Sequence, residues 1–460
     1  MGLIDNAPQL AQTLRQSLRG AARINRTFIK GSPLVARCLR HRRPPEPREL
    51  RELFESLGTT YIKLGQFIAS SPSLFPEPYI EEFQLCLDRT PNVPFSIIAK
   101  TIESELSARI EQKFSRIDPR PLASASIAQV HAAVMLDGRE VVVKVQKPAV
   151  RETINTDLNT AFLVARLLEM VTPTLSRSAI TDIITELHAS MIDECDFVKE
   201  ARNLVAFNNF CAQSNISDVF APLPIVSASS GRVLTMERVH GRSLVSDQWV
   251  SEADKQKVQR GLFNAMQAWL QSVSDCETFH ADLHSGNMLL QDDGRVAFID
   301  FGMVGRLEPR VWQAVQNLYA GIVAEDINKV ASAMIDVGMT KHKVYQRELV
   351  DDLEAVLNGL DEEPIESAAQ TTSGYAAGQK NKRSEQRADE QLAALMRVAT
   401  RHGIRFPSAF TLLLKQLLYF DRYLDLLAPG TDLFGEEVLN ASSLFDGPSA
   451  EIEPGNRGLH

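Results

Sequence analysis

Cysteine is scarce in this sequence, with five residues among 460 at wide and irregular spacing: Cys38, Cys86, Cys195, Cys211 and Cys276. Because none forms a CxxC pair or clusters with histidine, we expect neither a disulfide framework nor a zinc site. Long apolar runs are also lacking, since the nearest candidate, residues 406–427, contains two basic and two acidic side chains. The first residues lack the basic-then-apolar order of a secretory signal. These absences predict a cytoplasmic protein of a reducing compartment, without a transmembrane segment.

An excess of positive charge is absent as well. The chain has 49 lysines and arginines against 58 aspartates and glutamates, a net charge of −9. This balance disfavours a dedicated nucleic-acid binder. With 44% hydrophobic and 23% charged residues, the composition is typical of a globular protein. At roughly 100–200 residues per domain, the length predicts two or three packed units.

The basic residues gather at the N-terminus. Residues 1–43 contain nine lysines and arginines and a single acid, Asp5. Leu10, Leu14 and Leu18 recur among them at helical spacing, which predicts a basic amphipathic helix. Such a helix can lie on an anionic lipid surface, here as a peripheral contact at the inner face of the membrane. The alternative is a solvated helix that docks on the body of the protein.

The remaining chain alternates between helical and strand-like periodicity. Helices are expected within 48–116, 150–212 and 251–274 and throughout the chain from 308 onward, except for a loose polar excursion at 361–390. Strands are expected within 118–147, 231–239 and 288–299. The Asp137-Gly138 and Asp293-Gly294 dipeptides mark the turns of two hairpins.

The strongest polar cluster is the segment HADLHSGN at residues 280–287, followed by Asp300 in a DFG tripeptide. A protein-kinase catalytic loop places an Asp five residues before an Asn, with the DFG aspartate beyond a short hairpin. Asp282, Asn287 and Asp300 reproduce these offsets. Phosphoryl transfer needs oxygen ligands for Mg²⁺ and a carboxylate near the attacking hydroxyl. We therefore expect Asn287 and Asp300 to hold the metal and Asp282 to be the catalytic aspartate.

Other interpretations of this segment stay open. Asp282 and Asn287 are also common turn residues. His280 and His284 could form a metal pair, although a role in ordering the loop is the better expectation.

A kinase-like site also needs a strand lysine and a partner glutamate. Lys144 follows Val141-Val142-Val143, and strand alternation directs it away from the face that Val143 occupies. The alternative is a solubilising lysine on an edge strand. Glu194 and Glu200 are candidate partners on one helix, where six residues separate their directions by about 240°. They therefore cannot serve one partner, and the alternative for both is an exposed acidic face.

Two features of typical protein kinases are missing. Where a glycine-rich loop should precede the hairpin, the chain has Ala123-Ser124-Ala125-Ser126. Such a loop cannot adopt positive φ cheaply and should approach phosphates differently. After Gly302, a helix start at Glu308-Pro309 follows within a few residues, without an A-P-E motif. This leaves no room for an activation segment, so phosphorylation of proteins is disfavoured.

Together these residues resemble the UbiB/AarF family of atypical protein-kinase-like proteins, which is associated with quinone biosynthesis and membrane lipid homeostasis. The family motifs are K-x-G-Q, an alanine-rich loop, E-x-D and H-A-D-x-H-x-G-N. They match residues 63–66, 123–126, 194–196 and 280–287 of this chain. The resemblance spans about residues 50–305.

The resemblance implies roles for these residues. Lys144 would pair with Glu200 and, with the loop Ala123, Ser124, Ala125 and Ser126, bind the nucleotide. A second, regulatory network would consist of Lys63, Gln66, Glu194 and Asp196. In the family, the helical extension folds across the site where a peptide would bind. Leu283 and Ser285 replace prolines that are usual in the family, which predicts a looser catalytic loop.

The resemblance also implies an α+β, bilobal protein-kinase-like fold with an N-terminal helical extension and extra C-terminal helices. The expected segments are a basic arm (1–45), a helical extension (46–116), an N-lobe (117–240), a C-lobe with helical additions (241–440) and a tail (441–460). The expected function is that of an ATP-binding, Mg²⁺-dependent atypical kinase or ATPase in ubiquinone biosynthesis or related membrane lipid metabolism. Expected partners are a nucleotide, a lipid or quinone-precursor ligand, enzymes of those pathways and, through residues 1–43, a membrane. The alternatives are a small-molecule phosphotransferase and a nucleotide-binding scaffold without catalysis.

Overall fold

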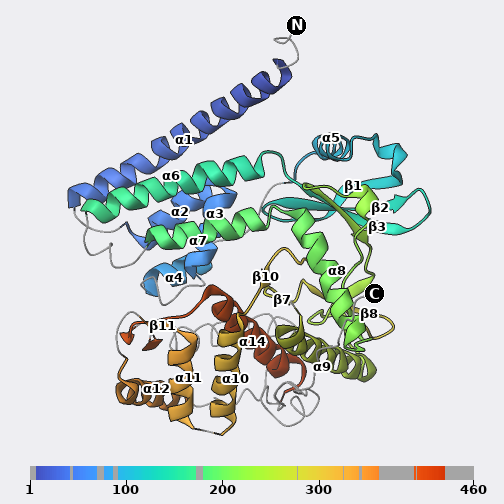
Figure 1. Ribbon diagram of the computed structural model, residues 1–460. Helices are drawn as coiled ribbons and strands as arrows, with labels where there is room; N and C mark the ends of the chain where they lie inside the picture. Colours follow the sequence, from blue (N-terminus) through green and yellow to red (C-terminus); the bar gives the residue numbers. More distant parts are fainter. Residues whose placement is uncertain are drawn as a thin grey trace, which may run out of the picture.

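The computed structural model describes residues 7–41, 45–69, 77–85, 92–171, 180–276, 278–324, 326–340, 344–361, 398–399 and 401–429 of the chain. They form two lobes (Figure 1). The upper lobe combines a sheet with a layer of helices, and the lower lobe is mainly helical. The predicted bilobal α+β architecture is therefore present.

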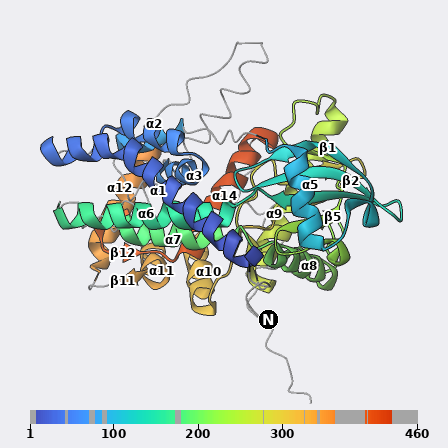
Figure 2. The same cartoon turned by 90° about the horizontal axis from the view of Figure 1, so that it is seen from above.

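The layer of helices flanks the upper sheet (Figures 1 and 2). It consists of α1 (Ala7–His41), α2 (Pro47–Leu57), α3 (Thr59–Ala69), α4 (Glu77–Gln84), α6 (Val150–Val171) and α7 (Ile180–Asp193). Helix α1 lies against α6, where Arg23 forms a bidentate ion pair with the buried carboxylate of Asp157. Lys30 and Arg37 also bind partners on the body, Ser56 and Glu49. The part of the basic arm whose side chains are described thus docks on the body.

The upper sheet has the strand order β1-β2-β3-β5, and every neighbouring pair is antiparallel. Its strands are β1 (Phe114–Ser124), β2 (Ala128–Met135), β3 (Glu140–Gln146) and β5 (Val233–Glu237), and α5 (Phe95–Leu106) covers one face. Strand β1 corrects the sequence analysis, which expected helix up to residue 116 and only two strands before 147. The strand contains two prolines, which normally argue against a β-strand because proline has no backbone N–H to donate. They are tolerated because β1 is an edge strand with an irregular register.

A helix break between α7 and α8 (Phe197–Gln213) is a second correction. Helical periodicity predicts Glu194 and Glu200 on one continuous helix. Instead α7 ends at Asp193, and the Asp196 side chain caps α8 by accepting from the backbone N–H groups of Val198 and Lys199. The conclusion that the two glutamates serve different partners is correct, although the helical geometry behind it was wrong.

The lower lobe contains a sheet of order β4-β9-β8-β6, made of β4 (Val219–Phe220), β6 (Gly241–Ser243), β8 (Met288–Gln291) and β9 (Val296–Phe298). Helix α9 (Glu252–Asp275) packs against this sheet, and α14 (Ser408–Leu427) packs against α9. Trp269 of α9 is fully buried between Phe279 and Phe420, with ring centroids 5.9 and 5.3 Å away. This aromatic contact fixes α14 against the segment that leads into the catalytic-loop motif.

Helices α10 (Pro309–Val323), α11 (Ile327–Val337) and α12 (Gln346–Asp361) complete the lower lobe. Two short strand pairs were not expected: β7 (Phe279–His280) with β10 (Val304–Gly305), and β11 (Met339–Thr340) with β12 (Ile404–Arg405). Two-residue strands give almost no periodic signal. The polar excursion expected at 361–390 lies, beyond Asp361, outside the described residues, as does the tail at 441–460. Within the described ranges, no helix has the length and apolarity needed to cross a membrane.

Candidate active site

Lys144 lies at the centre of a cluster of charges between the lobes. Its ammonium Nζ is 2.8 and 3.0 Å from the two carboxylate oxygens of Glu200 and 2.7 Å from Oδ1 of Asp300. Lys144 and Glu200 are buried, whereas the Asp300 side chain is 48% exposed. Three residues that are far apart in the sequence, on β3, on α8 and after β9, thus meet at one point.

Strand alternation aims Lys144 at this point. Val141, Val143 and Val145 are fully buried against α5 on one face of β3, as the sequence predicts. Lys144 projects from the opposite face, and its ammonium lies 5.4 Å from the ring centroid of Phe197. A buried ammonium requires anionic partners, which Glu200 and Asp300 supply.

The protonation of the cluster follows from burial and neighbouring charge. Burial raises the pKa of Glu200 to about 7; the Lys144 ammonium opposes this rise and Asp300 adds to it. Burial also acts to raise the pKa of Asp300, but the Lys144 ammonium outweighs it and holds that pKa below its usual range. Burial disfavours the charged form of Lys144, yet its two carboxylates raise the pKa of the ammonium overall. Lys144 and Asp300 are therefore charged at pH 7, while Glu200 titrates near neutrality.

Asp300 has a strained backbone. Its φ is +61°, in the left-handed region, which costs a residue other than glycine about 1–3 kcal/mol. A Cβ atom on Gly302 would lie 3.2 Å from Oδ1 of Asp300, so glycine leaves room for the carboxylate. Asn203 of α8 donates to the carbonyl of Phe301 at 3.1 Å and ties this turn to the helix that carries Glu200.

The hairpin β8–β9 brings Asn287 to Asp300. Met288 pairs with Phe298, and the N–H of Ile299 donates to the carbonyl of Asn287 at 3.0 Å. The Asn287 side-chain amide donates to the carbonyl of Asp282 at 2.9 Å, which uses its nitrogen and leaves the oxygen for a ligand. The loop and the DFG turn are therefore adjacent, as their spacing in the sequence predicts.

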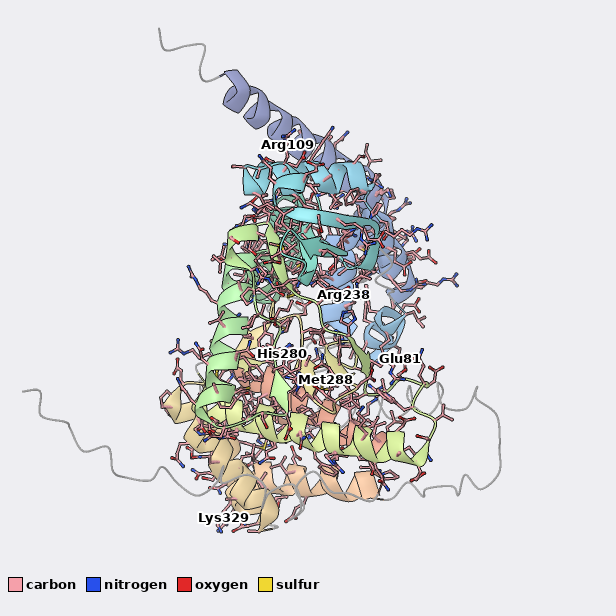
Figure 3. All side chains as sticks on the ribbon, turned by 90° about the vertical axis from the view of Figure 1, so that its right-hand side faces the viewer. Glu81, Arg109, Arg238, His280, Met288 and Lys329 are labelled. Atoms are coloured by element: carbon pink, nitrogen blue, oxygen red, sulfur yellow. The ribbon has the colours of Figure 1, made fainter. Side chains whose placement is uncertain are left out.

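His280 orders the loop. Its Nδ1 accepts a hydrogen bond from the backbone N–H of Asp282 at 3.1 Å, so Nδ1 has no proton. Nε2 is then the protonated nitrogen of a neutral ring and donates to the carbonyl of Ile299 at 3.0 Å. Burial lowers the pKa of this histidine, which agrees with the neutral ring. The ring also packs edge-on against Phe301, with centroids 4.6 Å apart. Figure 3 shows His280 in the middle of the molecule, between the upper sheet and the lower helices.

Asp282 contacts a residue that the sequence analysis did not find. Lys415 of α14 places its ammonium 3.4 Å from Oδ1 of Asp282, and Nε2 of His284 lies 3.9 Å from Oδ2. The neighbouring Gln416 exchanges two hydrogen bonds with the backbone of Leu283, at 2.7 and 3.3 Å. The expected loosening of the loop by Leu283 is therefore countered by α14. No local motif marks Lys415 or Gln416, since they lie about 130 residues after the loop.

The second predicted network is present in part. Lys63 of α3 forms an ion pair with Glu194 at the end of α7, and both side chains are largely buried. Asp196 instead caps α8, and Gln66 lies one turn after Lys63 on α3 with a partly exposed side chain. The Gln146 amide on β3 donates to the carbonyl of Cys195 at 2.6 Å. The E-x-D segment thus links the helical extension to the strand that carries Lys144.

The alanine-rich loop spans the end of β1 and the turn into β2. Ala123 and Ser124 end the strand, and the N–H of Ala125 donates to the carbonyl of Ala128 at 2.9 Å. Ser126 is buried. The Ser124 hydroxyl is buried and has no hydrogen-bond partner among the residues that the structure describes. A buried hydroxyl without a partner is a group that a bound ligand can satisfy.

The donor set fits a magnesium ion that is delivered with a nucleotide. Across the described part of the chain, no cluster of three or more His, Cys, Asp or Glu residues could hold a metal ion. Mg²⁺, however, commonly takes one or two protein oxygens and completes its shell with phosphates and water. Asn287 and Asp300 supply two such oxygens on adjoining segments, since the N–H of Ile299 donates to the carbonyl of Asn287.

Comparisons with known proteins agree with this geometry. The model of the ABC1 atypical kinase-like domain matches residues 85–334. This range includes the charge cluster and the catalytic-loop motif, whereas Lys63 and Lys415 lie outside it. An aarF domain-containing protein kinase of Arabidopsis thaliana, described as chloroplastic, is 40% identical over 413 residues, which cover 86% of this chain and 75% of that protein.

Two further relatives bear on family and fold. A probable protein kinase UbiB of Azotobacter vinelandii is 31% identical over 344 residues, covering 73% of this chain and 63% of the relative. The solved complex of Rv3197 with erythromycin from Mycobacterium tuberculosis superposes with a TM-score of 0.50 at 22% identity, over 84% of this chain and 92% of that one. At that identity the structural likeness concerns the fold alone.

Proposed function

The chain belongs to the ABC1 atypical kinase-like family, and from this premise we propose that it binds ATP with Mg²⁺ between its lobes and moves the γ-phosphoryl group beside Asp282. The observation that carries the proposal is the contact of Lys144 with both Glu200 and Asp300. It joins the lysine and glutamate that orient nucleotide phosphates in kinases to the DFG aspartate. A solubilising lysine on an edge strand would not be buried between two carboxylates.

Each residue would have a separate task. Lys144, held by Glu200, would bind the α- and β-phosphates, and the unsatisfied Ser124 hydroxyl would donate to a phosphate oxygen. Bound Mg²⁺, with Asn287 and Asp300 as its protein ligands, would neutralise charge on the phosphates. Asp282 would accept the proton of the attacking hydroxyl or water as the new phosphorus–oxygen bond forms and ADP leaves with the bridging oxygen.

The acceptor is proposed to be small. Residues 301–308 contain only the short strand β10 before α10 begins at Pro309. This leaves no extended segment on which a protein substrate could lie. The helical extension reaches the E-x-D segment through Lys63 and Glu194. Both features support ATP hydrolysis or transfer to a small molecule over phosphorylation of proteins.

A role at a membrane, in quinone or related lipid metabolism, completes the proposal. It is supported by the resemblance to UbiB proteins and by the exposed side of α1. There Ile24, Phe28 and Ile29 are 40%, 54% and 65% exposed, next to the exposed Arg26. Apolar side chains beside basic ones are typical of a helix that contacts anionic lipid. Arg23 is committed to Asp157, so the side of α1 that faces away from the body would make this contact.

The test is Mg-dependent phosphate release from ATP, measured with and without anionic liposomes. We expect Asp300→Asn to lower the rate at least about a hundredfold, because it removes a charged metal ligand. The matched control is Asp292→Asn in the turn of the β8–β9 hairpin that precedes Asp300, where the side chain is 95% exposed and the rate should not change. Phe28→Asp should abolish stimulation by liposomes and leave the lipid-free rate intact.

Three outcomes would change the proposal. Unaltered Mg-nucleotide binding by Asp300→Asn would contradict the metal assignment. Tight binding of ATP without turnover under any lipid condition would favour a scaffold. A phosphorylated product formed in amounts equal to the ADP released would identify a small-molecule phosphotransferase.

A further inference from the structure

Helix α14 touches the catalytic loop at two adjacent positions, Lys415 and Gln416, and both lie outside the matched family domain. Figure 1 shows α14 beside the short strands β7 and β10 that frame the loop. A helix more than 100 residues downstream thus contributes side chains to the region where transfer is proposed. Its contacts have two different chemical characters.

Gln416 acts on the backbone. Its side-chain oxygen accepts the N–H of Leu283 at 2.7 Å, and its nitrogen donates to the Leu283 carbonyl at 3.3 Å. Both Gln416 and Leu283 are fully buried. A proline at position 283 could not donate the first of these bonds, because it has no N–H group. The clamp therefore requires a residue other than proline at position 283, and it fixes the helix turn that carries Lys415.

Lys415 acts on the catalytic aspartate. Its ammonium lies 3.4 Å from Asp282 Oδ1 and 5.3 Å from the ring centroid of Tyr419, and its side chain is 30% exposed. Burial acts to lower the pKa of Lys415, but Tyr419 and Asp282 raise it overall, so the ammonium stays charged. An ammonium group has three N–H donors, so Lys415 can bind a further anion without leaving Asp282.

A cation is needed at this place. The transferring phosphoryl group carries negative charge on its three equatorial oxygens, and kinase-like sites stabilise it with positive charge. Residues 280–287 contain no lysine or arginine. His280 is neutral, and Lys144 already contacts two carboxylates. Within the described residues, the lysine that reaches Asp282 is Lys415.

We propose that Lys415 of α14 binds the γ-phosphoryl group during its transfer to the acceptor at Asp282. In that step the bond from the γ-phosphorus to the bridging oxygen breaks, a bond to the acceptor oxygen forms, and the acceptor proton passes to Asp282. Lys415 makes and breaks no covalent bond. It neutralises the equatorial oxygens and holds them in line with the acceptor. This inference rests on the proposed ATP chemistry and adds the residue that contacts the transferred group.

The experiment compares the full-length wild type with Lys415→Met, Lys415→Arg and Lys329→Met. Lys329 is a matched control, because its ammonium also lies 3.4 Å from a carboxylate, that of Asp326, at a position far from His280 (Figure 3). Binding of Mg-ATP and Mg-ADP is measured by calorimetry, together with the rate of phosphate release. Thermal unfolding of each variant checks that it is folded.

We expect Lys415→Met to weaken ATP binding about tenfold or more relative to ADP, since only ATP carries the γ-phosphate. Its turnover should fall on the order of a hundredfold. Lys415→Arg should restore most of the preference for ATP, and Lys329→Met should match the wild type. A merely structural role for Lys415 would alter ATP and ADP binding equally.

Failure of the inference and failure of the proposed function are distinguishable. If the wild type binds no ATP, the proposed function fails and this inference fails with it. If the wild type binds ATP and Lys415→Met keeps the wild-type ratio of ATP to ADP affinity, the inference alone is overturned. An increased turnover in Lys415→Met would also overturn the inference, because the ion pair with Lys415 would then inhibit Asp282 in the wild type.

Discussion

Two groups of paired charges, one in the helical layer around Arg23 and one between the lobes around Lys144, differ in how completely their charges are satisfied. In the layer, Arg23 meets Asp157 through two parallel hydrogen bonds of 2.8 and 2.6 Å, and its guanidinium also donates to the carbonyl of Leu57. Between the lobes, the single ammonium of Lys144 is shared between the carboxylates of Glu200 and Asp300. In the first arrangement one positive charge neutralises one carboxylate, whereas in the second one positive charge faces two carboxylates.

The difference indicates which pair is permanent. A bidentate arginine pair with a fully buried carboxylate has no open position for a ligand, so it joins α1 to α6. The cluster around Lys144 contains Asp300, which has a strained backbone and a half-exposed carboxylate, and Glu200, whose pKa is raised to about 7. Strain and shifted pKa values of this kind are found at functional sites. A bound cation or a rearrangement of the protein can reduce the excess of negative charge around Lys144. Either change would only weaken the Arg23–Asp157 pair.

Breaking the permanent pair should have the largest effect on stability. Arg23→Met leaves the Asp157 carboxylate buried without its cation, so we expect the free energy of unfolding to fall by about 3–5 kcal/mol. Urea denaturation of the full chain measures the loss. The control is Arg48→Met, which removes an exposed pair with Glu52 and should cost at most about 1 kcal/mol. Equal losses in the two variants would contradict the distinction between the layer and the surface.

The cluster around Lys144 should make stability depend on pH, unlike the Arg23–Asp157 pair. Because the pKa of Glu200 is raised from 4.5 to about 7, the folded state holds a proton that the unfolded state has released. The stabilisation from this bound proton is therefore complete below about pH 4.5 and is lost as the pH rises through 7. The free energy of unfolding should fall by up to about 3 kcal/mol over this range. Thermal unfolding at pH 5 to 8 should show this decline in the wild type relative to Glu200→Gln. Parallel curves would argue against the shifted pKa.

The ion pair between Lys63 and Glu194 is intermediate in burial between the Arg23–Asp157 pair and the exposed Arg48–Glu52 pair, so it tests how the stabilisation depends on exposure. Their side chains are 18% and 15% exposed, and the pair links α3 to the end of α7. Lys63→Met should lower the free energy of unfolding by about 1–2 kcal/mol, less than Arg23→Met, since water can reach the unpaired Glu194. The same denaturation series measures it. A loss equal to that of Arg23→Met would show that partial exposure does not weaken this pair.

Several elements were predictable because their signals are local. The apolar alternation of β3 fixed the direction of Lys144, and the Gly-containing turns at 138 and 294 marked the hairpins. Strand β1 was missed because its prolines are tolerated only at a sheet edge, and edge position is not a property of a local segment. The break at Asp196 was missed because a capping carboxylate resembles any other acidic residue on a helix until its backbone donors are known.

The family motifs, the offsets from Asp282 to Asn287 and Asp300, and the periodicities of the strands and helices that carry them can all be read from local sequence. These features depend on residues close together in the chain. Three contacts required the folded structure: Lys144 with both Glu200 and Asp300, Arg23 of the basic arm with Asp157 of α6, and Lys415 of α14 with Asp282. Each of these contacts joins residues tens to more than a hundred positions apart. Such contacts are set by how whole elements pack around a shared core, which no local pattern of residues records.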